Sequence, residues 1–304
     1  MPEGLIVKAL SGYYYVLPDH ASPNDISIQC RGRGILRKNE VTPLVGDRVI
    51  YTLTDGDSEG MVDEILPRTS ELIRPQVANA DTALLVFAAA EPDLSTHLLD
   101  KFLVHTEKHH LQTTICISKS DLLQPKEAYK LLETIDNIRQ IYETIGYSVL
   151  ICSAKTGEGK DEILAHLAGK ITVFSGQSGV GKSSLINAII PNMDIETNEI
   201  SVRLGRGKHT TRHVELLPLE NGGWVFDTPG FSQLDFAGIE TDDLSQFFVE
   251  FNQSEDLCKF RGCLHRNEPD CRVIEGVHAG RIAQSRYDHY LIFLQEISER
   301  KRRY

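Results

Sequence analysis

The sequence of 304 residues lacks an apolar run long enough to cross a membrane. Its longest uninterrupted apolar stretch, ALLVFAAA, covers residues 83–90, whereas a membrane-spanning helix needs about 20 such residues. The first residues also lack the basic segment followed by a long apolar one that is typical of a secretory leader. We therefore expect a cytoplasmic protein that makes no membrane contact.

Positive charge is scarce as well. The chain has 32 Lys and Arg against 43 Asp and Glu, for a formal net charge of -11. This balance argues against a protein that coats nucleic acid without specificity, because neutralising phosphates requires clustered cations. Three basic stretches without acids nevertheless occur: RGRGILRK at 31–38, VRLGRGKHTTRH at 202–213 and RKRR at 300–303. A solvated surface explains any one of them, but it is a less satisfactory account of three in one acidic chain.

Cysteine is too sparse for a disulfide framework, with six residues in a chain expected to be intracellular. Cys30, Cys116 and Cys152 each stand alone, the latter two in apolar, strand-like runs. A thiol in such a run behaves as a small hydrophobic group, so no chemistry is expected there.

The remaining cysteines form a cluster with the spacing of metal ligands. Cys258, Cys263, His265 and Cys271 provide three thiolates and an imidazole within fourteen residues, which is the ligand set of a closed structural zinc site. So short a segment cannot bury enough apolar surface to fold alone, so the metal would supply its stability. His278 is an alternative to His265 as a ligand, and chance crowding without a metal is the remaining alternative.

The character of the sequence changes twice along the chain, which predicts three domains. Residues 1–68 alternate short β-rich segments with turn clusters, as in a small closed barrel of the oligonucleotide-binding (OB) type. Residues 69–235 alternate strands and helices, which predicts an α/β domain with a largely parallel sheet. Residues 236–304 are helical and irregular, so we expect an α-helical zinc-binding domain with a closing helix from 279 to 303.

A complete phosphate-loop motif, G-x-x-x-x-G-K-[ST], follows an apolar strand and precedes a helical run. Its backbone N–H groups and the helix N-terminus would bind phosphate oxygens. Lys182 is the expected catalytic cation at the β- and γ-phosphates, and Ser183 is an expected Mg²⁺ ligand. The residues expected to contact the nucleotide here are Gly176, Gln177, Ser178, Gly179, Val180, Gly181, Lys182, Ser183 and Ser184.

A second metal-binding group follows the phosphate loop. Asp227 ends an apolar strand and forms the motif D-x-x-G with Gly230. Asp227 would hold Mg²⁺ through its water shell, and the Gly230 N–H would contact the γ-phosphate and report its presence. Alone, this motif is more typical of an ordinary strand-to-turn junction, but the preceding phosphate loop favours the functional interpretation.

Two strand ends carry elements that resemble those by which GTPases read guanine, N-K-x-D and S-A-K. The residues are Ser118, Lys119, Ser120 and Asp121 in the first element and Ser153, Ala154 and Lys155 in the second. The Asp121 carboxylate can accept both donors of guanine, N1–H and the exocyclic amine, whereas adenine would leave it unpaired. Lys119 would lay its methylene stem along the base. For the first element alone, an aspartate that caps a helix is the alternative.

In ordinary GTPases the guanine-reading elements follow the phosphate loop, so the order in this chain is circularly permuted. Permutation preserves the fold because the termini of a domain often lie close together. The permuted order, GRGKHTTRH at 205–213, DTPGF at 227–231 and the zinc-ligand spacing together resemble a known family. It is the ribosome small subunit-dependent GTPase A family (RsgA, also called YjeQ or EngC), and the resemblance covers nearly the whole chain.

The resemblance implies a cytoplasmic GTPase that hydrolyses GTP to GDP and phosphate. It implies that the protein binds the 30S ribosomal subunit and 16S rRNA late in subunit maturation, and that the subunit stimulates hydrolysis. The implied cofactors are structural Zn²⁺ and the Mg²⁺ that accompanies GTP. We expect a monomer.

Two positions depart from the usual GTPase pattern. Ser118 replaces an asparagine whose amide helps to tie the guanine loop to the phosphate loop, so a weaker guanine affinity is expected. Phe231 occupies the position of a water-orienting glutamine, so hydrolysis in isolation is expected to be slow. The family suggests His209 as the water-orienting group, with a loop histidine that contacts RNA as the alternative. Thr210 or Thr211 would reach Mg²⁺ and the γ-phosphate.

Two other functions compete with GTP hydrolysis. An ATP-using phosphotransferase would share the phosphate loop, but the carboxylate of Asp121 disfavours adenine. A zinc-dependent RNA-binding protein with a vestigial nucleotide site would keep the barrel and the metal cluster without any nucleotide chemistry.

Overall fold

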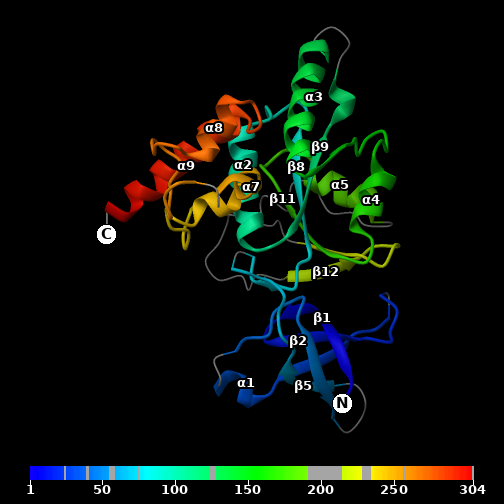
Figure 1. Cartoon of the computed structure of the whole chain (residues 1–304). Helices are drawn as coiled ribbons and strands as arrows, with labels where there is room; N and C mark the ends of the chain where they lie inside the picture. The colour runs from blue at the N-terminus through cyan, green and yellow to red at the C-terminus, as the bar shows by residue number, and fades with distance from the viewer. Residues whose placement is uncertain are drawn as a thin grey trace.

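The computed structural model describes most of the 304-residue chain (Figure 1). The described residues are 1–23, 25–38, 41–54, 59–73, 75–123, 128–190, 214–227, 234–255 and 258–302. No helix among them is long and apolar enough to span a membrane.

The first five strands close into a small barrel, drawn in blue at the bottom of Figure 1. The strands are β1 (Glu3–Leu10), β2 (Tyr13–Pro18), β3 (Ile28–Gly32), β4 (Arg48–Leu53) and β5 (Glu59–Ile65), and helix α1 (Gly34–Lys38) follows β3. They pair in the order β1-β2-β3-β5-β4, and β4 returns to β1. Buried positions in β4 alternate with more exposed ones, as a barrel with a filled interior requires. The predicted closed barrel is confirmed.

Strands β8 to β13 form the α/β sheet, in the order β10-β9-β8-β11-β13-β12. Their bounds are Thr82–Ala88 (β8), Gln112–Ser118 (β9), Ser148–Ile151 (β10), Ile171–Ser175 (β11), Val214–Pro218 (β12) and Trp224–Phe226 (β13). Only β12 runs antiparallel to its neighbour within this group, so the predicted, largely parallel sheet is confirmed. A short hairpin of β6 (Glu71–Leu72) and β7 (Val77–Ala78) connects the barrel to the sheet.

Helices cover both faces of this sheet. Their bounds are Thr96–Lys108 (α2), Ala128–Thr144 (α3), Lys160–Leu167 (α4) and Lys182–Ile189 (α5). Leu85 and Phe87 of β8 share a core with α2 and α3, whereas Leu84 and Val86 share another with α4 and α5. Because successive side chains of a strand point to opposite faces, every position of β8 is buried.

The barrel and the α/β sheet are continuous. Strand β1 pairs antiparallel with β12, which makes one sheet of 11 strands. The register aligns Lys8 with Glu215 and Ala9 with Val214. No local sequence pattern predicts this pairing, because the two strands lie about 200 residues apart in the chain.

The C-terminal region is helical around an apolar core that also includes Val104 of α2. Its elements are the 3-10 helix η2 (Leu244–Phe247) and the helices α7 (Val249–Glu255), α8 (Arg272–His278) and α9 (Gln284–Arg302). The prediction that the closing helix starts at residue 279 is wrong, because Gly280 adopts a left-handed φ of +72°. The N–H groups of Arg281 and Ile282 both donate to the Gly276 carbonyl oxygen, which ends α8 before α9 begins.

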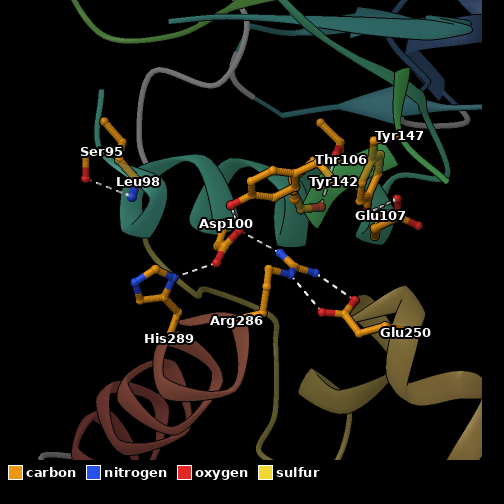
Figure 2. A network of polar contacts seen from close by, with 11 residues as sticks. Ser95, Leu98, Asp100, Thr106, Glu107, Tyr142, Tyr147, Glu250, Arg286 and His289 are labelled. Atoms are coloured by element: carbon orange, nitrogen blue, oxygen red, sulfur yellow. Dashed lines mark hydrogen bonds and ion pairs between the residues drawn. The ribbon is translucent and has the colours of Figure 1, made fainter. Parts of the chain in front are cut away.

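A fully buried guanidinium, that of Arg286 in α9, joins the C-terminal helices to the α/β domain (Figure 2). Its Nε and Nη2 donate to the two carboxylate oxygens of Glu250 in α7, at 2.7 and 2.9 Å. Its Nη1 donates to Asp100 Oδ1 in α2 at 2.7 Å. Asp100 also accepts from the Tyr142 hydroxyl of α3 at 2.6 Å and lies 2.6 Å from His289 Nδ1. Four helices therefore meet at one charged network.

Replacing Arg286 with alanine is expected to lower the free energy of unfolding by about 3–5 kcal/mol, because two buried carboxylates would lose their cation. Arg272→Ala is the matched control, since Arg272 pairs with Glu275 on the surface, where a lost pair costs less than about 1 kcal/mol. Urea unfolding followed by circular dichroism measures both variants. An equal loss of unfolding free energy in the two variants would contradict the larger contribution of the buried network to stability.

Candidate nucleotide site and metal cluster

The phosphate loop joins β11 to α5 at the carboxyl end of the parallel strands. A Cβ at Gly176 would lie 2.1 Å from the Val86 carbonyl oxygen, so only glycine lets the loop approach β8 this closely. Gly181 is the N-cap of α5 with a φ of +92°, a conformation that favours glycine. The other predicted loop residues are an exposed tip (Gln177, Ser178, Gly179), the buried Val180, and the half-buried Ser183 and Ser184 in the first turn of α5.

The ammonium group of Lys182 turns back over the phosphate loop. It donates to the carbonyl oxygens of Gly176 at 2.8 Å and Gln177 at 2.7 Å. Burial lowers the pKa of Lys182 to about 8, because desolvation disfavours the charged form. A phosphate bound in the loop would favour the ammonium again, so Lys182 can exchange its two carbonyl partners for phosphate oxygens.

The two elements predicted to read guanine lie next to one another, because β9 and β10 are neighbouring parallel strands. The Ser153 hydroxyl donates to Asp121 Oδ1 at 2.6 Å, and Lys155 Nζ lies 3.9 Å from Asp121 Oδ2. Ala154 and Lys155 form the turn after Ser153, with the Lys155 side chain exposed. Asp121 lies inside the 3-10 helix η1 (Ser120–Leu122), whose N-cap is Lys119. It is therefore not the helix-capping aspartate of the alternative interpretation.

Two further residues, Glu158 and Glu91, accept hydrogen bonds from these elements, and neither was predicted from the sequence. The Ser120 hydroxyl donates to Glu158 Oε2 at 2.6 Å, which links the two loops across β9 and β10. Lys119 Nζ donates to the main-chain carbonyl oxygen of Glu91, in the loop after β8. Neither contact has a sequence signal, since the first depends on the conformation of a loop and the second uses a backbone group.

Ser118 and Lys119 connect the first guanine-reading element to the phosphate loop. The Ser118 hydroxyl lies 2.5 Å from the Val180 carbonyl oxygen and 3.1 Å from that of Phe87. A Cβ at Gly181 would lie 3.9 Å from Lys119 Cε, so the lysine stem passes close to the end of the loop. Elements that are 62 residues apart in the chain thus lie against one another.

Asp227 follows β13, the strand beside β11, so it lies at the same end of the sheet as the phosphate loop. The Glu215 N–H donates to Asp227 Oδ1 at 2.9 Å, and the Asp227 N–H donates to the Glu215 carbonyl oxygen at 2.9 Å. A carboxylate and the hydroxyl of Ser183 are oxygen donors of the kind that Mg²⁺ prefers, so these residues fit that ion. The other residues expected near the γ-phosphate lie outside the described part of the chain: His209, Thr210, Thr211, Gly230 and Phe231.

The four predicted zinc ligands converge just before α8. The ligand atoms of Cys258, Cys263, His265 and Cys271 all lie within 4.8 Å of one another. His265 Nδ1 lies 3.3 Å from Cys271 Sγ and 3.8 Å from Cys258 Sγ, whereas ligands of a tetrahedral zinc ion are separated by roughly 3.5–3.8 Å. The cluster can therefore hold a metal ion with little rearrangement. The exposed His278, the alternative ligand, is not part of it.

Comparison with known proteins places the chain in a family. A sequence model of the RsgA GTPase matches residues 65–237, and a model of the RsgA N-terminal domain matches residues 3–62. The chain belongs to the RsgA GTPase family.

Relatives in the RsgA GTPase family match over the full length. The small ribosomal subunit biogenesis GTPase RsgA of Bacillus subtilis (strain 168) is 53% identical over 304 residues, which is 100% of both chains. The protein of the same name from Geobacillus thermodenitrificans (strain NG80-2) is 54% identical over 304 residues, again 100% of both chains.

Two solved structures share the fold of this RsgA-family chain. YloQ, described as a circularly permuted GTPase, has a TM-score of 0.85 and 48% identity, and the match covers 99% of this chain and 96% of the YloQ chain. YjeQ from Thermotoga maritima has a TM-score of 0.85 and 37% identity, and the match covers 97% of this chain and 98% of the YjeQ chain. The predicted permuted GTPase fold is confirmed. The strand order agrees, since β8, the first strand of the α/β sheet in the chain, lies beside β11, which leads into the phosphate loop.

For this RsgA-family chain, the structure modifies the expectation drawn from Ser118. The hydroxyl of Ser118 itself reaches the phosphate loop, where it donates to the Val180 carbonyl oxygen, so the serine retains the kind of link expected of an asparagine. We predict that Ser118→Ala raises the dissociation constant for GDP roughly fivefold, the equivalent of one lost hydrogen bond of about 1 kcal/mol.

Fluorescence titration with a labelled GDP measures this effect. Ser148→Ala is the matched control, because Ser148 is exposed at the opposite end of β10. An unchanged dissociation constant for Ser118→Ala would mean that the link does not position the guanine loop.

Proposed function

We propose that this chain is a GTPase of small ribosomal subunit biogenesis, which binds the 30S subunit late in its maturation. It hydrolyses GTP to GDP and phosphate, and the 30S subunit stimulates the reaction. The observation that carries the proposal is the contact of Ser118 with Val180, which joins a guanine-reading element to a phosphate loop. The ribosomal part is supported by relatives named small ribosomal subunit biogenesis GTPases, at 53% and 54% identity over the full length.

At the base end of the proposed site, the Asp121 carboxylate accepts hydrogen bonds from the two donors of guanine. The Ser153 hydroxyl holds one carboxylate oxygen at 2.6 Å and so fixes its orientation. Adenine presents an acceptor where guanine presents N1–H, so with ATP the carboxylate would lose its hydrogen bonds to the base. The Lys119 stem lies along the base.

At the phosphate end, water attacks the γ-phosphorus and the bond to the β,γ-bridging oxygen breaks, so that GDP leaves. Lys182 and the N–H groups of residues 176–183 stabilise the charge that develops on the phosphate oxygens. Ser183 and Asp227 hold Mg²⁺, which when bound neutralises part of the phosphate charge. His209 orients the attacking water, and Thr210 or Thr211 contacts the γ-phosphate. With Phe231 in the position of a water-orienting glutamine, the reaction is slow without the ribosome.

The barrel and the zinc-binding region contact 16S rRNA in this proposal. On the barrel surface, the Arg31 guanidinium lies 4.8 Å from the centre of the Tyr13 ring. Basic groups and aromatic rings are the two components of surfaces that bind single-stranded RNA. We propose domain boundaries at 1–68, 69–235 and 236–304, and a monomer that acts in the cytoplasm with Zn²⁺ in the C-terminal cluster.

Phosphate release from GTP and from ATP tests the proposed function, each measured alone and with purified 30S or 50S subunits. We expect slow release from GTP alone and marked acceleration only for GTP with 30S subunits. Equal release from ATP would favour an ATP-using phosphotransferase. Binding to 30S subunits without any nucleotide hydrolysis would favour an RNA-binding protein with a vestigial nucleotide site.

A further inference from the structure

Strand β12 lies between the barrel and the carboxylate proposed to hold Mg²⁺. On one side, both main-chain groups of Glu215 are bound to Asp227: its N–H donates to Oδ1, and its carbonyl oxygen accepts the Asp227 N–H. On the other side, Glu215 is paired in register with Lys8 of β1. One residue thus contacts both the metal-binding carboxylate and the barrel.

The geometry of an antiparallel ladder explains why the side chains of Lys8 and Glu215 meet. The N–H and C=O groups of one residue point to the same neighbouring strand, and those of Glu215 point toward Asp227. Lys8 and Glu215 are therefore a non-hydrogen-bonded pair, in which opposing side chains approach most closely. Their charged groups form an ion pair with Lys8 Nζ 3.1 Å from Glu215 Oε2.

A second contact from the barrel reaches the residue just before Asp227. The Gly46 N–H donates to the Ile6 carbonyl oxygen of β1. A Cβ at Gly46 would lie 2.0 Å from the Ala78 carbonyl oxygen and 3.3 Å from Phe226 Cζ. The Gly46 backbone therefore approaches the fully buried Phe226, the residue next to Asp227, in addition to the contact that the barrel makes through β12.

We propose that Lys8 and Glu215 are positioning residues for the Asp227 carboxylate, which couple the barrel to the occupancy of the Mg²⁺–nucleotide site. The inference rests on the proposed function and deepens it. A shift of β1 moves Glu215, whose N–H fixes one oxygen of the Asp227 carboxylate. Because coupling between two sites is reciprocal, a nucleic acid that binds the barrel changes the retention of Mg²⁺ and nucleotide, and the loaded site changes the affinity of the barrel.

A purely structural role of the ion pair predicts a different result. Both side chains are about one-third exposed, so the pair contributes less than about 1 kcal/mol to global stability. Loss of the ion pair would then change nucleotide retention only a little, and the change would be the same with and without Mg²⁺. A positioning role predicts an effect that requires Mg²⁺.

The test is the dissociation rate of a fluorescent GDP from the full chain, measured over a Mg²⁺ titration and in excess EDTA. Lys8→Glu is expected to accelerate release roughly fivefold in saturating Mg²⁺, the lower range of typical coupling between sites, with no change in EDTA. The charge-swapped double variant Lys8→Glu/Glu215→Lys is expected to restore most of the retention. Arg139→Glu is the matched control, since it reverses one charge of an exposed ion pair on α3.

Two results would overturn the inference. The first is a GDP dissociation rate of the Lys8→Glu variant that depends on Mg²⁺ in the same way as that of the unaltered chain. The second is an acceleration of GDP release by Lys8→Glu that is as large in EDTA as in saturating Mg²⁺. Thermal unfolding of each variant checks that the barrel stays folded, and Glu215→Gln offers a milder change with the same expected direction. An unaltered chain that fails to bind GDP would instead overturn the proposed function, so the two failures are distinguishable.

Discussion

Lys182→Ala is expected to lower kcat/KM for GTP by about 100- to 1,000-fold, the range seen when one preorganised donor to a developing charge is removed. The ammonium is already directed into the phosphate loop, where it donates to the carbonyl oxygens of Gly176 and Gln177. Alanine would remove the only side-chain cation of the loop motif. Single-turnover phosphate release with 30S subunits present measures the loss.

The matched control is Lys170→Ala, because Lys170 precedes the same strand, β11, and donates to Gln112 Oε1 on the surface. Its kcat/KM is expected to equal that of the unaltered chain. A Lys182→Ala variant that keeps full stimulated activity would contradict the proposed site.

The pKa of about 8 for Lys182 adds a pH dependence to nucleotide binding. A bound phosphate stabilises the ammonium, so the pKa is higher in the complex than in the free protein. Below about pH 8 the free lysine is already charged and binding is strongest, whereas above it binding must take up a proton and weakens as the pH rises. The Lys182→Ala variant should lose this dependence.

Removal of zinc is expected to unfold the C-terminal region while the α/β domain keeps its nucleotide site. Structural zinc contributes on the order of 10 kcal/mol to the folding of small domains, and the cluster supports an apolar core that includes Cys263, Cys271 and Tyr290. Cys271→Ser, or treatment with a chelator, should therefore expose residues 258–283 to proteolysis. Labelled GDP should still bind.

Two measurements test this prediction: the zinc content by atomic emission, and limited proteolysis with the fragments identified by mass spectrometry. His278→Ala is the matched control, because His278 is exposed at the end of α8 and lies outside the cluster. A zinc stoichiometry of one that survives Cys271→Ser, with unchanged proteolysis, would contradict the assignment of the four ligands.

The sequence by itself determined the local chemistry of this protein. The phosphate-loop motif, the Asp227 carboxylate at a strand end and the four Cys and His residues that could hold a metal ion were predicted from residue types at fixed spacings. Such spacings follow from the geometry of a single turn or strand end, so a short segment carries the whole signal. The largely parallel sheet was predictable for a similar reason, because buried strands such as β8 are continuous apolar runs. The start of α9 was not, since the break at Gly280 depends on a left-handed conformation that glycine permits but does not require.

Only the tertiary structure decided which individual residues of distant segments meet. Arg286 and Asp100 are 186 residues apart in the chain. The resemblance predicted that the guanine-reading element approaches the phosphate loop, but only the structure showed the contact of Ser118 with Val180, 62 residues apart. The pairing of β1 with β12, which places Lys8 beside Glu215, is a further example. No periodicity or local spacing specifies such partners, because they depend on how all the apolar faces of the chain are buried at once. The physical reason is that a motif is a property of a few consecutive residues, whereas a docking contact is a property of the whole packed arrangement.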